Sequence, residues 1–221
     1  MLKTNHQPNP YRIFMTNCTI SWAVFDYGGV LAEEGFVAGL EAIAEKEELR
    51  PEYVFETARD IILSTGYLTG EALEETFWNR FRRKTGIKRS DQELRNEILS
   101  RFVLRPWMVE LIGELKKNRI NTAILSDQVN WLDELDIRDN FFRHFDRVYN
   151  SFHVGMSKNN PAIFDELIQW IDSSPNTILF TDDHLPHIKR ARSRGINAIH
   201  YTDKDSFLRE FSGLCPLLST M

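Results

Sequence analysis

Polar residues with catalytic chemistry follow four short apolar runs of the chain. They are Asp26, Ser126 with Asp127, Lys158, and Asp182 with Asp183. Three carboxylates brought together repel one another unless a cation lies between them, and a hard divalent cation such as Mg²⁺ prefers oxygen ligands. A lysine and a hydroxyl beside such a cation suit the oxygens of a phosphate group. The set therefore predicts a magnesium site that receives a phosphorylated ligand.

The runs that precede these residues have the composition of buried strands. Five runs of about five residues, rich in β-branched or aromatic types, predict parallel strands covered on both faces. They span 22–26, 122–126, 147–151, 177–182 and 197–201. Apolar residues at helical spacing lie between them, as in the segment that begins at Pro106 and in 163–171. This alternation predicts the α/β class, a doubly wound parallel sheet whose carboxyl edge forms the ligand crevice.

One stretch interrupts the alternation with helical patterns alone. Helix start signals within it are Pro51, Thr69 and the capping box from Ser90 to Glu93. We therefore divide the chain into a flexible tail at 1–18, an α/β core at 19–34 and 105–221, and a helical cap at 35–104. The cap leaves from the carboxyl end of the first strand, where the site is expected.

Composition excludes several classes of function. The 221 residues carry a net charge of −5, which argues against nucleic acid as a partner. No run approaches the length of about 18 apolar residues that a membrane span needs. The two cysteines, Cys18 and Cys215, lie near opposite ends, so we expect no disulfide framework and favour a reducing cytoplasm.

The basic stretch RFRRKTGIKR at 80–89 is either a solvated helix end or a contact for phosphate or nucleic acid.

Taken together, the motifs resemble those of the haloacid dehalogenase-like (HAD) hydrolase superfamily. VFDYGGVL is similar to its first motif, AILSD to the second, GMSKNNPAIF to the third and ILFTDDHLPHIKRARSRGINAIHY to the fourth. The helical segment stands where this superfamily inserts its C1-type cap. The resemblance implies an Mg²⁺-dependent phosphatase, similar to a sugar-1-phosphatase-like subgroup.

The resemblance also implies a role for each matching residue. Asp26 is the nucleophile, which forms an aspartyl-phosphate, and it also binds Mg²⁺ together with the Gly28 carbonyl oxygen, Asp182 and Asp183. Ser126 and Lys158 bind the transferring phosphoryl group and complete the catalytic set. Gly28 and Gly29 leave room for backbone amides to close on phosphate oxygens, and Asp127 belongs to the same substrate-binding region.

Three positions depart from the superfamily pattern. Gly28 replaces the aspartate that most of these phosphatases use as acid and base, a contribution of about 10²–10⁴-fold in rate. Asp127 stands where asparagine is usual, and an extra carboxylate repels phosphate unless it turns away, is protonated or pairs with a cation. Asn159 stands where proline usually follows the lysine. A non-catalytic phospho-ligand binder or interaction protein with this fold is therefore the alternative. A 2-haloacid dehalogenase is less favoured, because Tyr27 is one position early for its Tyr-Gly-Thr sequence.

The expected substrate is a small phosphorylated metabolite, held by a monomer or homodimer without nucleic acid or membrane. Residues of the cap entrance that are candidates to line its pocket are Glu33, Phe36 and Tyr67, although aromatic residues there also suit a packed core. His184 follows the paired aspartates and is either a substrate contact or a surface turn residue.

Overall fold

Five parallel strands form a sheet in the order β3-β2-β1-β4-β5 in the computed structural model, which describes residues 18–216. The strands are β1 (Trp22–Phe25), β2 (Asn121–Ser126), β3 (Arg147–Asn150), β4 (Ile178–Asp182) and β5 (Asn197–His200). β1 lies at the centre, where Trp22 pairs with Asn121 of β2 and with Ile178 of β4. The predicted α/β class and all five predicted strands are confirmed.

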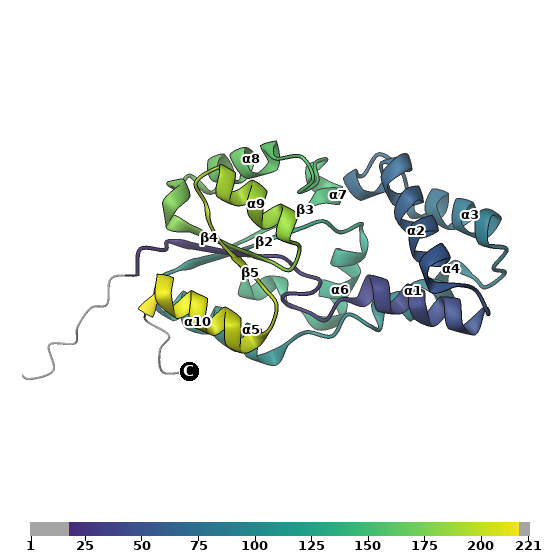
Figure 1. Cartoon of the computed structure of the whole chain (residues 1–221), viewed down its shortest axis with the longest axis horizontal. Helices are drawn as coiled ribbons and strands as arrows, with labels where there is room; N and C mark the ends of the chain where they lie inside the picture. Colours follow the sequence, from purple (N-terminus) through teal and green to yellow (C-terminus); the bar gives the residue numbers. More distant parts are fainter. Residues whose placement is uncertain (1–17, 217–221) are drawn as a thin grey trace, which may run out of the picture.

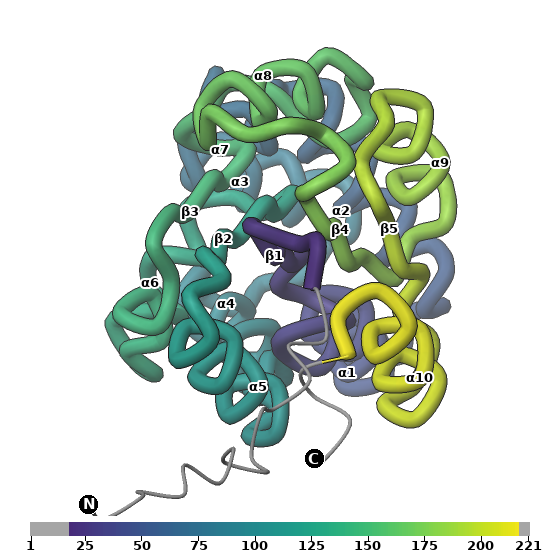
Figure 2. The backbone as a smooth tube through the Cα atoms, turned by 90° about the vertical axis from the view of Figure 1, so that its left-hand side faces the viewer, coloured from purple at the N-terminus to yellow at the C-terminus, as the bar shows by residue number. Residues whose placement is uncertain are grey.

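Helices cover both faces of this sheet (Figure 1). One face is packed by α5 (Pro106–Lys117) and α10 (Lys204–Leu214), and the other by α8 (Ala162–Ile171) and α9 (Leu185–Ser193). Figure 2 shows these two layers above and below the central strand. Along β1, Ala23 and Phe25 belong to one apolar core and Val24 to the other, as alternation along a strand requires. Two further helices of the sheet domain are α6 (Trp131–Asp139) and α7 (Ser151–Val154).

A lobe of four helices extends from the carboxyl edge of the sheet (Figure 1). It contains α1 (Gly35–Lys46), α2 (Pro51–Thr65), α3 (Glu74–Thr85) and α4 (Asp91–Leu99), with a 3₁₀ turn at Tyr67–Thr69. Pro51 begins α2, and Ser90 with Glu93 forms the predicted capping box of α4. The predicted helix start at Thr69 is wrong. Gly70 follows with a φ of +75°, and a Cβ there would lie 2.4 Å from the Phe152 carbonyl oxygen, so the chain turns against α7 before α3 begins.

Two chain segments connect the lobe to the sheet, and they are bonded to each other. Ala32 and Leu104 form an antiparallel bridge between them. The Arg105 guanidinium donates to the carbonyl oxygens of Gly29 and Val30 at 2.6 and 2.7 Å, and to both carboxylate oxygens of Glu33. The lobe therefore enters and leaves through one paired connection.

A second set of contacts joins the lobe to α6. The indole nitrogens of Trp78 and Trp131 both donate to Glu74 Oε1, at 2.7 and 3.0 Å. The Tyr67 hydroxyl donates to the Asn130 side chain, and the Tyr67 ring packs edge-on against Trp131. Because these aromatic side chains are buried, the lobe packs on the sheet domain through a continuous apolar contact.

The cysteines correct one sequence prediction. Cys18 and Cys215 form a disulfide, with Cα atoms 4.4 Å apart across a separation of 197 residues. The prediction that they do not pair is wrong, because α10 runs back toward the amino end of β1 and brings its last residues beside the first described residue. The argument for a reducing cytoplasm rested on unpaired cysteines and loses that support.

The predicted flexible tail, apart from Cys18, lies outside the described residues. Between residues 18 and 216, no helix combines the length and apolar character needed to cross a membrane.

Candidate active site

The strand ends bring the predicted charged residues to one place at the carboxyl edge of the sheet. Lys158 Nζ lies 2.6 Å from Asp26 Oδ2 and 2.6 Å from Asp182 Oδ2. The Lys158 side chain is fully buried, while that of Asp26 is 13% exposed. Asp26 thus joins a buried ion pair on one side and remains open on the other, as a group that meets a ligand must.

Two further donors orient the Asp26 carboxylate. The Ser126 hydroxyl at the end of β2 donates to Asp26 Oδ1 at 2.8 Å, and the Tyr27 amide donates to the same oxygen at 2.6 Å. Ser126 can do so because β2 pairs with β1 in parallel register, which brings the carboxyl ends of both strands together. The Tyr27 ring itself packs between Phe102 and Phe141 in the apolar core.

Three carboxylates gather closely enough to bind one cation. Asp26, Asp182 and Asp183 each place an oxygen within 4.8 Å of the others. Gly29 permits this approach, because a Cβ at its position would lie 2.1 Å from Asp183 Oδ2. Its φ of +76° is also one that residues with side chains rarely adopt. These three carboxylates outnumber the one lysine beside them. Their hard oxygen donors are the ligands that Mg²⁺ prefers, so the set fits this ion.

The charges in this cluster shift one another's protonation. Burial disfavours the charged form of Lys158, yet the carboxylates of Asp182, Asp26 and Asp127 outweigh it and raise the pKa of Lys158 far above its usual range. Burial opposes ionisation of Asp182 too, but Lys158 and His187 hold the pKa of Asp182 well below normal.

Asp26 behaves in the opposite way. Burial, reinforced by the charges of Asp182 and Asp183, raises the pKa of Asp26 to about 8, against the attraction of Lys158. Burial and Asp182 also raise the pKa of Asp183. A carboxylate that must attack as an anion near neutral pH therefore needs additional positive charge beside it, which is what a divalent cation supplies.

Asp127 turns toward the lysine loop. Its Oδ1 accepts a hydrogen bond from the Lys158 backbone amide at 2.8 Å, and burial raises the pKa of its carboxyl group. In the same loop, Asn160 Oδ1 accepts from the Ala162 amide at the start of α8. Asp127, which follows β2, thus holds the loop that contains Asn159 and Asn160, and this loop still buries Lys158 against Asp26.

Sequence reasoning missed a histidine in this cluster. His187 Nδ1 lies 3.1 Å from Asp182 Oδ2, and its side chain is buried. The sequence feature that could have identified His187 is its position five residues after Asp182, in the first turn of α9. His184, which the sequence offered as a substrate contact or a turn residue, is exposed, and its backbone amide donates to Asp182 Oδ1 at 2.7 Å.

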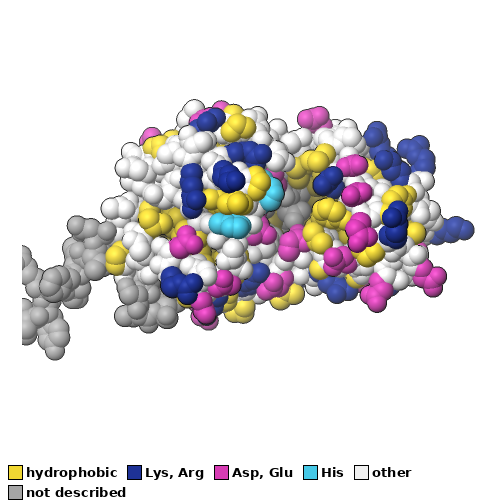
Figure 3. Space-filling view, viewed as in Figure 1, with side chains coloured by type: hydrophobic (Ala, Val, Ile, Leu, Met, Phe, Trp, Pro, Cys, Tyr) yellow, Lys and Arg dark blue, Asp and Glu magenta, His cyan; other side chains and the backbone are white. Residues whose placement is uncertain are grey.

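A pocket of about 190 Å³ lies between the lobe and the segment 127–131 that follows β2, and Asp127 is its residue nearest in sequence to Ser126. Figure 3 shows a hollow between the lobe and the sheet domain, with acidic side chains on its rim. Its walls are Glu34, Phe36, Arg59, Ile62, Leu63, Leu68, Asp127, Gln128, Val129 and Trp131. Most of this lining is apolar.

The predicted lining residues fare differently. Phe36 lines the pocket, as expected. Glu33 instead pairs with Arg105 at the connection, and Tyr67 is packed core. Glu34, which the sequence analysis did not select, is the acidic residue of the lobe that faces the pocket. Its sequence signal is its position immediately before the first lobe helix.

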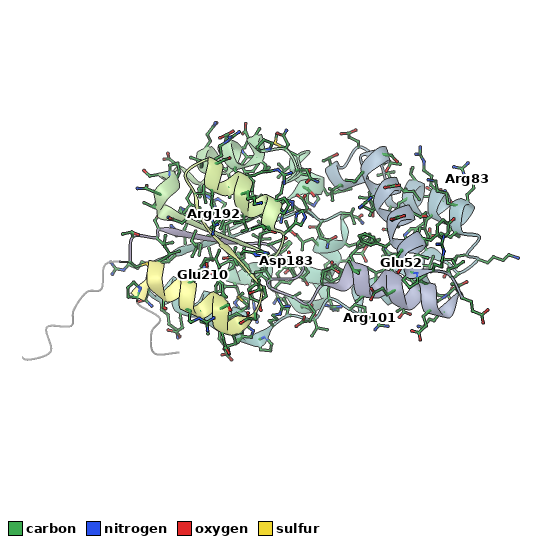
Figure 4. The ribbon with its side chains drawn as sticks, viewed as in Figure 1. Glu52, Arg83, Arg101, Asp183, Arg192 and Glu210 are labelled. Carbon is green, nitrogen blue, oxygen red and sulfur yellow. A yellow bond between two sulfur atoms is a disulfide. The ribbon has the colours of Figure 1, made fainter. Side chains whose placement is uncertain are left out.

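The basic stretch at 80–89 lies away from the site. Figure 4 places Arg83 at the outer end of the lobe, far from Asp183. Within the stretch, Arg82 pairs with Asp91 and Arg89 with Glu93. These contacts match the solvated helix end rather than a phosphate contact.

The sequence pattern of the haloacid dehalogenase-like hydrolases matches residues 20–195, so the chain belongs to this family of hydrolases. Among curated proteins, it is 35% identical over 118 residues to bifunctional epoxide hydrolase 2 of Rattus norvegicus. It is 34% identical over 110 residues to that of Sus scrofa. These matches cover 50% and 47% of the chain but only 21% and 20% of the relatives. The chain thus matches about a fifth of the length of these relatives.

Solved structures share the fold. A HAD family enzyme from Bacteroides thetaiotaomicron superposes with a TM-score of 0.72 at 20% identity, over 87% of this chain and 98% of that one. The same enzyme has also been solved in complex with magnesium and inorganic phosphate, with a TM-score of 0.65 and 21% identity over 84% and 94% of the chains. L-2-haloacid dehalogenase from Xanthobacter autotrophicus superposes with a TM-score of 0.61 at 18% identity, over 88% and 83%. At these identities the likeness establishes the fold alone.

Proposed function

We propose that this hydrolase is an Mg²⁺-dependent phosphatase that acts on a small phosphorylated metabolite. The observation that carries the proposal is the burial of Lys158 between Asp26 and Asp182, with Asp183 beside them. A buried lysine next to a partly open carboxylate and a hydroxyl suits a phosphoryl group, whose oxygens need several donors at once.

Each residue has a defined task in this proposal. Asp26 attacks phosphorus and becomes an aspartyl-phosphate, which water then hydrolyses. Ser126 and Lys158 donate to the phosphoryl oxygens as negative charge moves onto them. The carboxylates of Asp26, Asp182 and Asp183, with the Gly28 carbonyl oxygen, would hold Mg²⁺. When bound, Mg²⁺ neutralises the carboxylates and polarises the phosphoryl group.

The lining of the pocket determines which kind of leaving group the substrate can have. Helices α1 and α2 provide Phe36 and Leu63, and the segment around α6 provides Val129 and Trp131. Apolar side chains make up most of these walls and suit an alkyl or aryl group, whereas the polar residues of the same lining can hydrogen-bond to hydroxyl groups. We therefore assign the lobe the role of a cap that selects the leaving group of the substrate.

The test uses p-nitrophenyl phosphate with the whole chain. The wild type should release p-nitrophenol with Mg²⁺ and lose this activity in EDTA. Asp26→Asn should lower turnover by at least about 10³-fold, because the nucleophile is lost while the shape is kept. Asp205→Asn, an exposed position on α10, is the matched control and should leave turnover unchanged. Absence of turnover across aryl, alkyl and sugar phosphates would contradict the proposal.

Two alternatives predict other outcomes. Gly28, which has no carboxylate to serve as acid, favours a non-catalytic phospho-ligand binder. In that case inorganic phosphate with Mg²⁺ raises the melting temperature, and no substrate turns over. A 2-haloacid dehalogenase would release chloride from 2-chloropropionate. Displacement of chloride at carbon does not call for a divalent cation, so its rate would not depend on Mg²⁺.

A further inference from the structure

Hydrolysis of an alkyl or phenyl phosphate needs a proton for the leaving oxygen, and the cluster around Asp26 has no free acid for it. Asp26 attacks, Asp182 is held ionised by Lys158 and His187, Asp183 is engaged as a proposed Mg²⁺ ligand, and Gly28 has no side chain. The acid must therefore come from a group that lines the leaving-group pocket. The carboxyl groups in the lining of that pocket are Glu34 and Asp127.

Glu34 lies beside the loop that carries Asp26. A Cβ built on Gly28 would be 3.3 Å from the Phe102 ring and 3.8 Å from Glu34 Oε1. A carboxyl group on that Cβ would reach into the same space, so Glu34 presents its oxygen close to where a side chain of residue 28 would end. Glu34 lies in the segment that connects the nucleophile loop to the lobe, immediately before α1.

The two oxygens of Glu34 have different surroundings. Oε2 accepts a 2.7 Å hydrogen bond from the Val37 amide, which caps α1, whereas Oε1 accepts only a 3.3 Å contact from the Phe36 amide. Helix capping thus fixes the carboxyl group in place. Oε1, the oxygen near Gly28, makes only this long contact and can still form a hydrogen bond to a ligand. Burial, aided by the charges of Asp183 and Glu41, raises the pKa of Glu34 despite these amide bonds, which favours retention of a proton.

Asp127 is less suited to this task. Its Oδ1 is committed to the Lys158 backbone amide, and its partner loop is packed beneath the ion pair. Loss of its proton would add a further negative charge beside Asp26 and Asp182. Glu34 lines the same pocket as Phe36.

We propose that Glu34 is the general acid and base of this hydrolase, a role that rests on the proposed phosphatase function. As Asp26 forms a bond to phosphorus, the bond from phosphorus to the leaving oxygen breaks and that oxygen takes the proton of Glu34. The Glu34 carboxylate then removes a proton from water as the water oxygen attacks the aspartyl-phosphate. The products are the alcohol and inorganic phosphate, with Asp26 and protonated Glu34 restored.

The experiment compares two aryl phosphates that differ in their need for a proton. Glu34→Gln should lower the single-turnover rate of phenol release from phenyl phosphate by about 10²–10⁴-fold, but that of p-nitrophenol release from p-nitrophenyl phosphate by less than about 10-fold, since nitrophenolate leaves without help. Glu33→Gln, the neighbouring carboxylate that faces Arg105, is the matched control and should change neither rate. Glu34→Asp is the second variant, to be used if the glutamine variant does not fold. It keeps an acid and a helix cap, but its carboxyl group is one carbon further from the leaving oxygen. It should therefore show the same selective loss to a smaller degree.

Equal loss on both substrates would overturn the inference, because it would indicate a structural or binding role. No loss on either would overturn it too, as would a selective loss in Asp127→Asn instead. These outcomes all require a wild type that turns over p-nitrophenyl phosphate and an inactive Asp26→Asn. A wild type without turnover would instead remove the phosphatase proposal and this inference with it.

Discussion

The two ends of the same five strands carry different chemistry. At the carboxyl ends, Asp26, Lys158 and Asp182 form a buried cluster of charges. At the amino ends of β1 and β4, neutral groups make the contacts. The Ser21 hydroxyl contacts the hydroxyls of Ser173 and Thr177 at 3.0 and 2.9 Å, and the Cys18–Cys215 disulfide ties β1 to α10.

This difference follows from what each end must do. Buried charges destabilise a fold unless each one is paired, so four aspartates around one lysine fit the proposed ligand site better than a stabilising role. Neutral hydrogen bonds and a covalent bond stabilise without that penalty. We therefore expect changes at the carboxyl ends to affect turnover first, and changes at the amino ends to affect stability alone.

The largest effect is expected at Lys158. Lys158→Met should lower turnover by at least about 10³-fold, because the phosphoryl oxygens lose their buried cation. It should also lower the free energy of unfolding by about 3–5 kcal/mol, since Asp26 and Asp182 are left unpaired. Kinetics and urea unfolding measure the two effects. Lys158→Met with Asp182→Asn should regain stability without activity, and a return of activity would break the comparison.

The disulfide provides the opposite case. Replacing both Cys18 and Cys215 by serine should lower the free energy of unfolding by about 2–4 kcal/mol, because the unfolded chain gains freedom. Turnover at 25 °C should stay within twofold of the wild type, since the bond lies at the far end of the sheet. Thermal unfolding and kinetics on the same preparation test this, and a selective fall in kcat would show that the two ends communicate.

The stability of the metal-free protein should depend on pH, because its carboxylates lie close together. The pKa of Asp26 is raised to about 8, so between pH 4 and 8 the folded state keeps a proton that the unfolded chain releases. Stability in EDTA should therefore fall as pH rises through this window, by up to about 1.4 kcal/mol per pH unit. Urea unfolding at pH 5, 6, 7 and 8 measures the slope. Asp26→Asn should flatten it, and a slope that persists in that variant would assign it to other groups.

Two serines at opposite ends of the sheet offer the smallest and most closely matched test. Ser126→Ala removes the hydroxyl that contacts Asp26 and should lower turnover by about 10–10²-fold with little change in stability. Ser21→Ala should lower the free energy of unfolding by about 1 kcal/mol with turnover unchanged. Measured side by side, an equal effect of both variants on turnover would remove the distinction between the two ends.

Local patterns of the sequence were sufficient for much of the fold. Short β-branched runs, helical spacing after Pro106 and Pro51, and the capping box at Ser90 depend on residues a few positions apart, and each appears where the pattern indicates. The gathering of Asp26, Lys158, Asp182 and Asp183 was also predictable, because parallel strands put their carboxyl ends at one edge.

Other features depended on contacts between distant segments. The start of α3 was decided by the approach of Gly70 to Phe152, and the direction of Asp127 by the Lys158 amide. The disulfide and the position of Glu34 beside Gly28 arise the same way, from a returning helix and a paired connection. The sequence by itself determined which chemistry meets at the sheet edge, since alternating strands and helices indicate a parallel sheet whose strands end at one edge. Only the tertiary structure decided which side chains complete the site, because their partners come from elsewhere in the chain.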